Sequence, residues 1–286
     1  MASHEIPNVV RRADPVGEPA PLVFDSPHTG LAFPSDFRPS IPMELCERVA
    51  DWYVEELFGA APAHGAILLE ALFRRAYIDP NRSERDLDLS MVEGDWPDAV
   101  DTTEKTARGA SLIWKVIDGE TAIYDRRLTV DEVRHRIETY WRPYHAALRT
   151  ALDETYARFG RVFHVDCHSM PEWGDPRWGD QGERRADFIV GNRDGTTATA
   201  AYTEVVVETL RASGYSVAVN VKFKGVELIR RYADPAAGRE ALQIEVNRGI
   251  YMDETAIARS ERFGATKAAI TRMIAALEGY ARAAAG

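Results

Sequence analysis

The sequence is poor in cysteine and has no long apolar run. Its 286 residues include two cysteines, Cys46 and Cys167, which lie far apart in the chain. The chain does not open with a basic segment followed by an apolar run, as a secretory signal does. Both features favour a reduced, cytoplasmic compartment. The apolar runs end after about five to seven residues, short of the roughly 18 that span a bilayer, so we expect a soluble protein.

Basic residues are also in deficit. The chain has 35 Lys and Arg against 45 Asp and Glu, which gives a formal net charge of −10. Nucleic acid and anionic membrane surfaces are therefore excluded as leading partners. With 45% hydrophobic residues, the chain can bury a full core. It shows no repeat and no break in composition, so we expect one domain, residues 1–286, in which the Pro-rich residues 1–20 are extended.

Apolar runs typical of buried strands alternate with helical patterns. Strands are expected at residues 22–24, 66–69, 76–78, 162–165, 188–190, 217–221 and 242–246. Helices are expected at about residues 43–58, at 129–159 with a capping box at the start and a kink at Pro143, at 198–212, and from about 254 to the end. Strands that alternate with helices predict an α/β sheet with helices on both faces.

The signatures of several enzyme classes are missing. The chain contains no HExxH pair, no GxGxxG, no P-loop, no GxSxG elbow and no CxxC. Cys167 directly precedes His168, but adjacent residues on a strand point to opposite faces, so they cannot form a Cys/His catalytic pair. We expect Cys167 to be a small core residue.

Four polar blocks stand at or just beyond the ends of apolar runs: SPHTG at residues 26–30, DPNR at 79–82, DCHS at 166–169 and QIEVNR at 243–248. Ligands of α/β sheets bind outside the carboxyl ends of the strands, which is where these blocks fall. His28 and His168 have matching settings there, and their imidazoles could share one Zn²⁺ that keeps an open position for water. The alternative for each is a core or turn histidine with satisfied hydrogen bonds.

Charged side chains complete the parts of a hydrolytic site. Glu245 lies in an apolar strand, where burial would raise its pKa and suit it to act as a general base. The alternative is an ion pair with Arg248. Arg75, Arg82 and Arg248 could fork onto ligand carboxylates, stabilise an oxyanion, or form structural ion pairs.

Two long segments lack a regular pattern. Residues 83–109 are rich in charge, and residues 170–186 carry two tryptophans with several Gly and Pro residues. Long ordered loops in a compact domain are more often functional than idle, so both are expected to form walls or lids over the site.

The blocks SPHTG, DPNR, DCHSMP and ALQIEVNRGIYMDE, with GASLIWKV, YWRPYHAAL and FKGVELIRRY between them, resemble the N-formylglutamate amidohydrolase family. The resemblance runs from about residue 22 to residue 254. It implies a mixed, mostly parallel sheet of about eight strands flanked by helices, similar to zinc carboxypeptidases and to aspartoacylase and succinylglutamate desuccinylase. It also implies one catalytic Zn²⁺, whose bound water hydrolyses N-formyl-L-glutamate to formate and L-glutamate at the end of histidine degradation.

The resemblance implies that His28 and His168 are metal ligands, but the third ligand departs from the wider group. That group has a glutamate three residues after the first histidine, where this chain has Leu31. We expect Asp51, mid-helix among apolar neighbours, to complete the site, with Glu55 or Asp166 as the fallback. An ordinary solvated helix face is the alternative for Asp51.

The remaining roles concern a small dicarboxylate substrate. The resemblance implies that Asn81 and Arg82 hold the α-carboxylate and that Arg75 polarises the scissile carbonyl. Arg248 is expected at the γ-carboxylate, and Ser169 either hydrogen-bonds the ligand or fixes its turn. The resemblance also matches Glu245 to the base.

Other functions stay open at this point. The same chemistry could deacylate another N-acylamino acid or remove the C-terminal residue of a short peptide. Val226 stands where the family usually carries a second glycine after Gly225, which could narrow the pocket or alter the substrate. A different class is a non-catalytic binding protein for an acidic amino acid or peptide, but such a site gains nothing from the buried carboxylate of Glu245.

Overall fold

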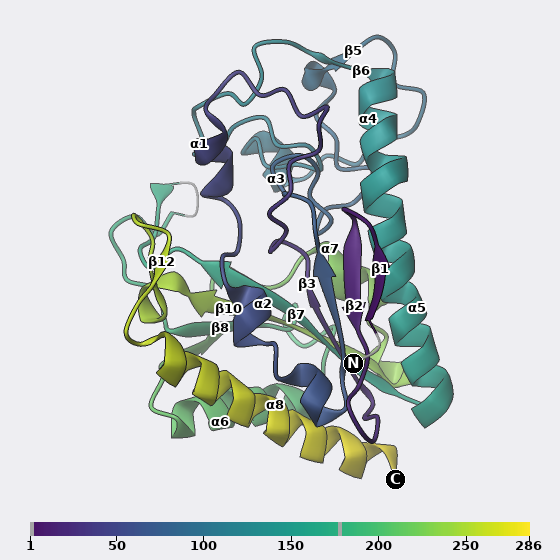
Figure 1. The fold of residues 1–286 in the computed structure, drawn as a ribbon, viewed down its shortest axis with the longest axis vertical. Helices are drawn as coiled ribbons and strands as arrows, with labels where there is room; N and C mark the ends of the chain where they lie inside the picture. The colour runs from purple at the N-terminus through teal and green to yellow at the C-terminus, as the bar shows by residue number, and fades with distance from the viewer. Residues whose placement is uncertain (1–2, 177–178) are drawn as a thin grey trace.

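Within the residues that the structure describes, an eight-stranded sheet organises the chain (Figure 1). The structure is a computed structural model that describes residues 3–176 and 179–286. The strands follow the order β1-β2-β4-β3-β7-β10-β8-β9 across the sheet. Their bounds are Ser3–Ile6 (β1), Val10–Ala13 (β2), Leu22–Ser26 (β3), Ile67–Ala71 (β4), Val162–Met170 (β7), Phe188–Gly191 (β8), Val217–Val219 (β9) and Arg239–Asn247 (β10).

The middle of the sheet is parallel. Strand β3 pairs in parallel with β4 and β7, and β7 pairs in parallel with β10. Strand β8 runs antiparallel to β10 and parallel to β9, while β1 and β2 extend the other edge as antiparallel strands. The carboxyl ends of β3, β4, β7 and β10 therefore open on one edge, which is the ligand-binding edge of such sheets. The predicted mixed, mostly parallel α/β fold is confirmed.

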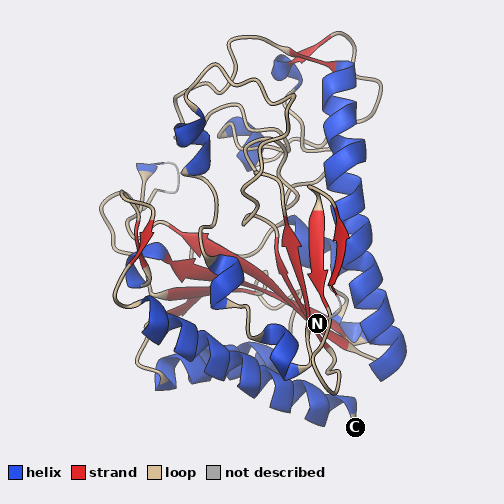
Figure 2. Ribbon diagram, viewed as in Figure 1, coloured by secondary structure: helices blue, strands red, loops and turns tan. Residues whose placement is uncertain are grey.

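Helices cover both faces of this sheet (Figure 2). Their bounds are Met43–Glu47 (α1), Val54–Leu57 (α2), Glu104–Ala107 (α3), Val130–Arg136 (α4), Arg142–Phe159 (α5), Ala200–Ala212 (α6), Glu227–Tyr232 (α7) and Phe263–Ala285 (α8). Alternate side chains of β3 point to opposite faces. Leu22 and Phe24 pack in one core with residues of α6 and α8, whereas Val23 packs in the other core with residues of α5. One sheet with a core on each face supports treating residues 1–286 as one domain, which we propose.

Two predictions, for residues 1–20 and for residues 76–78, differ from the structure. The Pro-rich residues 1–20, for which extended chain was expected, contribute strands β1 and β2 to the sheet. The expected strand at residues 76–78 is wrong, since this segment is a turn that leads out of the sheet. Its apolar side chains are buried in the core that also holds α5, so their hydrophobicity reflects burial and not strand pairing.

The expected helix over residues 43–58 is broken in the middle. Helix α1 ends at Glu47 and α2 begins at Val54, and between them Tyr53 adopts the left-handed conformation at φ 66°. A sequence pattern reports which residues are apolar, but it does not show where a buried polar group draws the backbone out of a helix. The break matters because it contains Asp51.

The other helices follow the predictions more closely. The helix over residues 129–159 is confirmed, with Thr129 as N-cap in a capping box and a π-helical turn, Ile137–Trp141 (η3), just before Pro143. Helix α6 lies within the expected residues 198–212. The final helix begins at Phe263, later than expected, because β11 (Met252–Asp253) and β12 (Ala258–Arg259) form a hairpin first. No helix in the described part of the chain is both long enough and apolar enough to cross a membrane.

Candidate metal centre and active site

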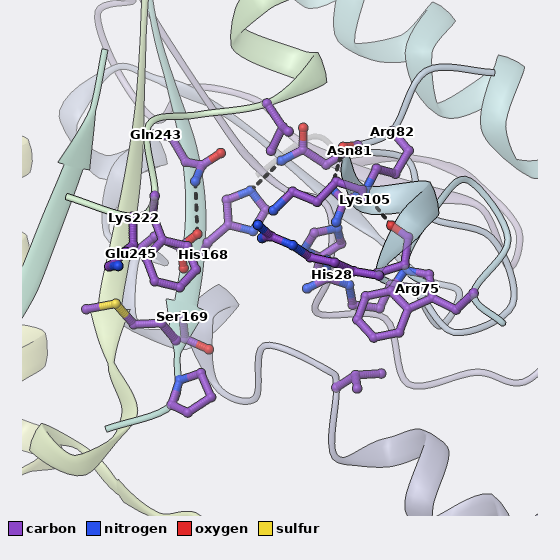
Figure 3. Close-up of a pocket in the computed structure, with 18 of the residues that line it drawn as sticks. His28, Arg75, Asn81, Arg82, Lys105, His168, Ser169, Lys222, Gln243 and Glu245 are labelled. Carbon is purple, nitrogen blue, oxygen red and sulfur yellow. Dashed lines mark hydrogen bonds between the residues drawn. The ribbon is translucent and has the colours of Figure 1, made fainter. Parts of the chain in front are cut away.

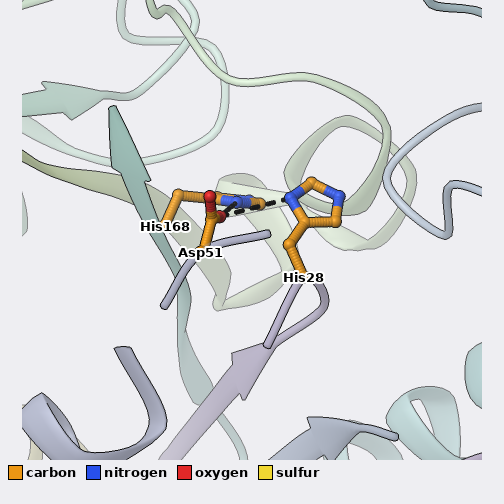
Figure 4. A group of neighbouring side chains, drawn as sticks. All are labelled: His28, Asp51 and His168. Carbon is orange, nitrogen blue, oxygen red and sulfur yellow. Dashed lines mark hydrogen bonds and ion pairs between the residues drawn. The ribbon is translucent and has the colours of Figure 1, made fainter. Parts of the chain in front are cut away.

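Two histidines and one aspartate meet at the carboxyl edge of the sheet (Figure 4). His28 follows β3, His168 belongs to β7, and Asp51 comes from the break between α1 and α2. Asp51 Oδ2 lies 3.3 Å from Nδ1 of His28 and 3.0 Å from Nδ1 of His168. One ligand atom from each residue lies within 4.8 Å of the others, and all three residues are buried. The structure thus brings together the three residues predicted to hold a metal.

Asp51 is fixed by its backbone and by its second carboxylate oxygen. Its backbone N–H donates to the carbonyl oxygen of His28 at 3.0 Å, which draws the chain out of the helix. Oδ1 accepts hydrogen bonds from Arg248 Nη2 at 3.1 Å and from Ser169 Oγ at 3.3 Å. Burial opposes ionisation, but the hydrogen bonds and charges of His168 and His28 outweigh it and hold the Asp51 pKa well below its ordinary value. Asp51 therefore carries a negative charge at neutral pH.

Each histidine is anchored from behind by a second carboxylate. His28 Nε2 lies 2.7 Å from Asp79 Oδ1, and His168 Nε2 lies 2.7 Å from Asp166 Oδ1. With a metal ion on the Nδ1 side, these contacts would keep the ring proton on Nε2 of both rings, so that the lone pair of each Nδ1 could face the space beside Asp51. Asp166, a fallback ligand in the sequence analysis, thus supports His168 from the far side.

Glu55, the other fallback ligand, belongs to a different environment. It lies on α2, where burial together with the charge of Glu70 raises its pKa to about 7. It is not part of the His28, Asp51 and His168 group among the described residues.

Asp79 was not singled out in the sequence, although it opens the DPNR block. Its Oδ2 accepts hydrogen bonds from Arg75 Nη2 at 2.9 Å and from Trp114 Nε1 at 3.1 Å. Burial raises the pKa of this carboxyl, but the charges of Arg75, His28 and Arg82 outweigh burial and hold the pKa well below its ordinary value. Asp79 can therefore hold the proton of His28 Nε2 as a charged acceptor.

The side chain of Asn81 is turned toward the metal cluster. Its Nδ2 donates to Asp166 Oδ2 at 3.0 Å and lies 2.8 Å from His168 Nε2. Its Oδ1 accepts from the backbone N–H of Leu228 at 3.0 Å, which fixes the orientation of the amide. Asn81 therefore holds Asp166, the carboxylate behind His168, at the wall of the cavity.

The two arginines predicted to bind carboxylates differ in how their donors are used. Arg82 donates from Nε to the Ala110 carbonyl at 2.8 Å and from Nη1 to the Asn81 carbonyl at 2.9 Å, and its Nη2 lies 3.9 Å from Asp79. All three nitrogens of Arg248 donate within the fold: Nε to Ser169, Nη1 to the carbonyl of Arg48, and Nη2 to Asp51 and the carbonyl of Ala50. The guanidinium of Arg248 is thus engaged in holding Asp51 and Ser169.

Glu245 stands beside the metal cluster on β10. It is directly opposite His168 in the register of β10 and β7, and its Oε1 accepts from Gln243 Nε2 at 2.9 Å (Figure 3). Burial raises the pKa of Glu245 to about 7, although the charges of His168 and Arg75 lower it. The ion pairs of Arg248 in the described chain go to Asp51 and Glu254. The ion pair between Glu245 and Arg248, which was the alternative considered from the sequence, is not found among the described residues.

A cavity of about 570 Å³ opens over these groups. Its described lining includes eight Lys or Arg residues and three Asp or Glu residues, so its walls are cationic in an acidic protein. Residues 83–109 contribute Lys105 and Arg108, and residues 170–186 contribute Pro171 and Asp175. Both loops therefore form walls, as expected, although residues 177–178 of the second loop, including Trp178, lie outside the described residues. Val226 also lines the cavity.

Sequence reasoning did not give a role to Lys105, which Figure 3 shows extending into the cavity between Arg82 and His168. Burial and the charges of Arg82, Arg108 and Arg75 lower the Lys105 pKa to about 7. The only sequence signal was the high charge of residues 83–109, which did not distinguish this lysine from its neighbours.

The blocks GASLIWKV, YWRPYHAAL and FKGVELIRRY hold the loop that carries Asp79 and Arg82. Trp114 from the first block donates to Asp79, as described above. From the second, Trp141 Nε1 donates to the Arg82 carbonyl at 2.9 Å, and His145 Nε2 donates to the Pro80 carbonyl at 2.8 Å. Burial lowers the pKa of His145 to about 3, so this ring is neutral. The third block supplies the N–H that orients Asn81.

Comparison with known proteins bears on what this arrangement does. The family model described as N-formylglutamate amidohydrolase matches residues 20–252. An N-formylglutamate deformylase of Pseudomonas putida is 31% identical over 248 residues, which cover 82% of this chain and 83% of that protein. One from Pseudomonas aeruginosa is 29% identical over 279 residues, 92% of this chain and 94% of that protein. The crystal structure of N-formylglutamate amidohydrolase from Ralstonia eutropha JMP134 has a TM-score of 0.94 and 43% identity, and it covers 97% of this chain and 99% of its own. The resemblance seen in the sequence is confirmed.

Proposed function

The chain belongs to the N-formylglutamate amidohydrolase family, and from this membership we propose that it hydrolyses the amide of N-formyl-L-glutamate to formate and L-glutamate. The observation that carries the proposal is the group of His28, Asp51 and His168, with Glu245 beside it, in a cationic cavity. Amide hydrolysis needs a polarised carbonyl, an activated water and a proton carrier. The two carboxylates of the substrate account for a cationic lining in an acidic chain.

We propose that the three clustered side chains hold one Zn²⁺. The fit is supported by His28 Nδ1, which is buried and makes no hydrogen bond among the described residues, although it faces Asp51. Two imidazole nitrogens and one carboxylate, with a further position for water, form the usual donor set of a hydrolytic zinc site. A zinc ion held there would polarise the formyl carbonyl and lower the pKa of water to about 7.

Glu245 is proposed as the general base and then the general acid. It takes a proton from the attacking water as the oxygen joins the formyl carbon, and it returns that proton to the nitrogen as the C–N bond breaks. A pKa of about 7 suits both transfers, because the group is neither too weak a base nor too weak an acid at neutral pH. The hydrogen bond from Gln243 holds one carboxylate oxygen in place during the exchange.

Arg75 is proposed to stabilise the oxyanion. Its guanidinium donates to Asp79 and lies 4.9 Å from the centre of the Trp114 ring, so it is held in place beside the cluster. A fixed donor aimed at developing charge in a buried site lowers the reaction barrier more than a mobile one.

The remaining residues are proposed to bind substrate or to hold the cluster. Arg82 is proposed to bind the α-carboxylate. It lines the cavity, and its Nη2 lies 3.9 Å from Asp79 Oδ2, which is longer than a hydrogen bond. Asn81 is proposed to support the cluster next to the α-carboxylate site by donating from Nδ2 to Asp166, the carboxylate behind His168. The sequence suggested that Arg248 binds the γ-carboxylate. The hydrogen bonds that Arg248 and Ser169 donate to Asp51 instead support a role in positioning Asp51.

Metal analysis combined with formate release tests the proposal. We expect about one zinc per chain, loss of formate release from N-formyl-L-glutamate after chelation, and recovery on adding zinc. N-acetyl- and N-succinyl-L-glutamate and short acidic peptides, tested in parallel, separate deformylation from the related deacylase and carboxypeptidase activities. Tight binding of the substrate without turnover at any metal loading would instead indicate the binding protein.

We also propose a cytoplasmic location for the enzyme. Cys46 and Cys167 are both buried and unlinked, which is consistent with a reduced compartment. Fractionation of cells followed by immunodetection tests this proposal directly, with appearance in an oxidising compartment as the contradictory result.

A further inference from the structure

Three buried polar atoms in the described lining of the cavity have no hydrogen-bond partner among the described residues. They are Nδ1 of His28, Nε of Arg75 and Oε1 of Gln243. A buried polar atom without a partner costs free energy, so each of them calls for a ligand group or a water molecule. The proposed zinc ion accounts for His28, and the donor of Arg75 suits the formyl oxygen. Oε1 of Gln243 is an acceptor, so a ligand that satisfies it must supply an N–H or an O–H.

The amide of Gln243 is oriented by Glu245. The two residues are two positions apart on β10, so their side chains lie on the same face of the strand. Gln243 is 2% exposed, and its Nε2 donates to Glu245 Oε1 at 2.9 Å. An ionised carboxylate only accepts hydrogen bonds, so the NH2 branch must face Glu245. The oxygen branch is then the one turned away from Glu245 (Figure 3), and the free atom is an acceptor.

Gln243 is enclosed on the sides formed by the sheet. Its register partners are Asp166 on β7 and Gly191 on β8. The Asp166 carboxylate stands behind His168, 2.7 Å from its Nε2. Gly191 has no side chain, and a Cβ there would lie 2.6 Å from the backbone of Lys224, so the loop that carries Lys224 closes over this side. We therefore expect the missing donor to come from the cavity, which Gln243 lines.

N-formyl-L-glutamate has one group that can satisfy this oxygen. At neutral pH its carboxylates and its formyl oxygen only accept hydrogen bonds, so the amide N–H is the one donor of the molecule. The free donor of Arg75 and the free acceptor of Gln243 thus match the C=O and the N–H of a secondary amide.

The same contact would place the scissile nitrogen next to the base. The Gln243 amide would accept from the substrate N–H through its oxygen while it donates to Glu245 through its nitrogen. As water adds to the formyl carbon, the substrate nitrogen loses its conjugation with the carbonyl and gains a lone pair that must take up a proton. A fixed N–H gives that lone pair a defined direction, which shortens the path of the proton from Glu245.

We propose that Gln243 accepts a hydrogen bond from the N–H of the scissile amide and thereby restricts the enzyme to secondary amides. The inference rests on the proposed function for the identity of the reaction, and it adds the residue that recognises the amide nitrogen. Gln243 acts by contact with the substrate, while the proton transfers stay with Glu245.

The test compares N-formyl-L-glutamate with N-formyl-N-methyl-L-glutamate, a tertiary amide that has no N–H. Both compounds release an amine and make the same demand on Glu245 as an acid. The loss of the Gln243 hydrogen bond to Glu245 therefore cancels from the ratio of the two kcat/KM values, as does a folding defect. In the zinc-loaded Gln243→Ala variant, we expect the preference for the secondary amide to fall about 10-fold or more, because no buried acceptor is left without its donor when the methyl compound binds.

Two further variants separate the hydrogen bond from effects of space. Gln243→Met keeps most of the volume of glutamine without the acceptor, and it should also lower the preference. Gln181→Ala removes an exposed glutamine outside the described lining, and it should keep the wild-type ratio. An unchanged ratio in Gln243→Ala overturns the proposal and points to a water molecule as the partner of Oε1. A fall in Gln243→Ala with an unchanged ratio in Gln243→Met also overturns it, because space alone would then explain the preference.

Calorimetry separates failure of this inference from failure of the proposed function. If the zinc-loaded wild type releases no formate, binding of the same two compounds to the wild type and to Gln243→Ala gives the readout. A binding preference that depends on Gln243 then means that the proposed activity fails and the contact stands, whereas no such preference overturns both. If formate is released and the preference in kcat/KM does not depend on Gln243, the contact fails and the activity stands.

Discussion

Replacing Glu245 by Gln should remove activity and, at neutral pH and above, make the metal-free protein more stable. The glutamate is buried, and its pKa in the folded chain is about 7 against an ordinary value of 4.5. Between these values the folded chain keeps a proton that the unfolded chain has released. The free energy of unfolding therefore falls as the pH rises from about 4.5 to about 7, and stays at the lower level above that range.

The size of this effect follows from the same shift. The difference in pKa corresponds to at most about 3.5 kcal/mol above pH 7, at about 1.4 kcal/mol for each pKa unit. Glutamine has nearly the same shape, can keep the hydrogen bond from Gln243, and carries no charge to bury. At roughly 2–4 °C for each kcal/mol in a chain of this size, Glu245→Gln should raise the Tm at pH 8 by up to roughly 7–14 °C.

The assay is thermal unfolding of chelator-treated wild type and Glu245→Gln at pH 4 and at pH 8, with the exposed Glu93→Gln as control. The Tm difference should be small at pH 4 and should grow to its full size at pH 8. In the zinc-loaded enzyme, the same variant should lose about 100- to 10,000-fold in kcat with little change in KM. A variant that melts below wild type at pH 8, or one that keeps its kcat, would refute the reasoning.

Three further changes test the supporting contacts. Asp79→Asn removes the charged acceptor behind His28 and should weaken zinc binding about 10- to 100-fold, measured by competition with a chromophoric chelator; unchanged affinity contradicts this role. Arg82→Lys should raise the KM for N-formyl-L-glutamate about 10-fold or more with a smaller change in kcat, because a point charge does not reproduce a fork; steady-state kinetics showing only a kcat loss would exclude it. Trp141→Phe loses the hydrogen bond to the Arg82 carbonyl and should lower the free energy of unfolding by about 1–2 kcal/mol in urea titrations, whereas an unchanged midpoint would show the bond to be dispensable.

Much of the site could be predicted because its residues lie next to local patterns. Polar residues at or just beyond the carboxyl ends of buried strands reach the ligand-binding edge of a parallel sheet, and this rule located both histidines and Glu245. Asp51 could be chosen because a carboxylate among apolar residues needs a partner. The reason for its position was different from the expected one, since Asp51 sits in a break between α1 and α2 and not within a helix.

The partners of each polar group could not be predicted in the same way. Asn81 and Arg248 have the residue types of ligand-binding groups, yet they donate hydrogen bonds to Asp166 and Asp51 of the fold. Lys105 was one charge among many in residues 83–109, and only the tertiary structure places it in the cavity lining beside Arg82. A hydrogen bond forms with whichever group lies about 3 Å away, and in this chain those groups are often separated by more than a hundred residues.

The sequence by itself determined the α/β alternation, the family resemblance and the chemical types that gather at the edge of the sheet. These properties depend on local periodicity and on short motifs, which are the same before and after folding. The tertiary structure decided which carboxylate faces both histidines, which carboxylates stand behind them, and which cations line the cavity. Strand order places β3, β7 and β10 side by side although they are distant in the chain. Burial at that junction then determines which charges are retained, because a desolvated charge persists only where a partner lies within contact distance.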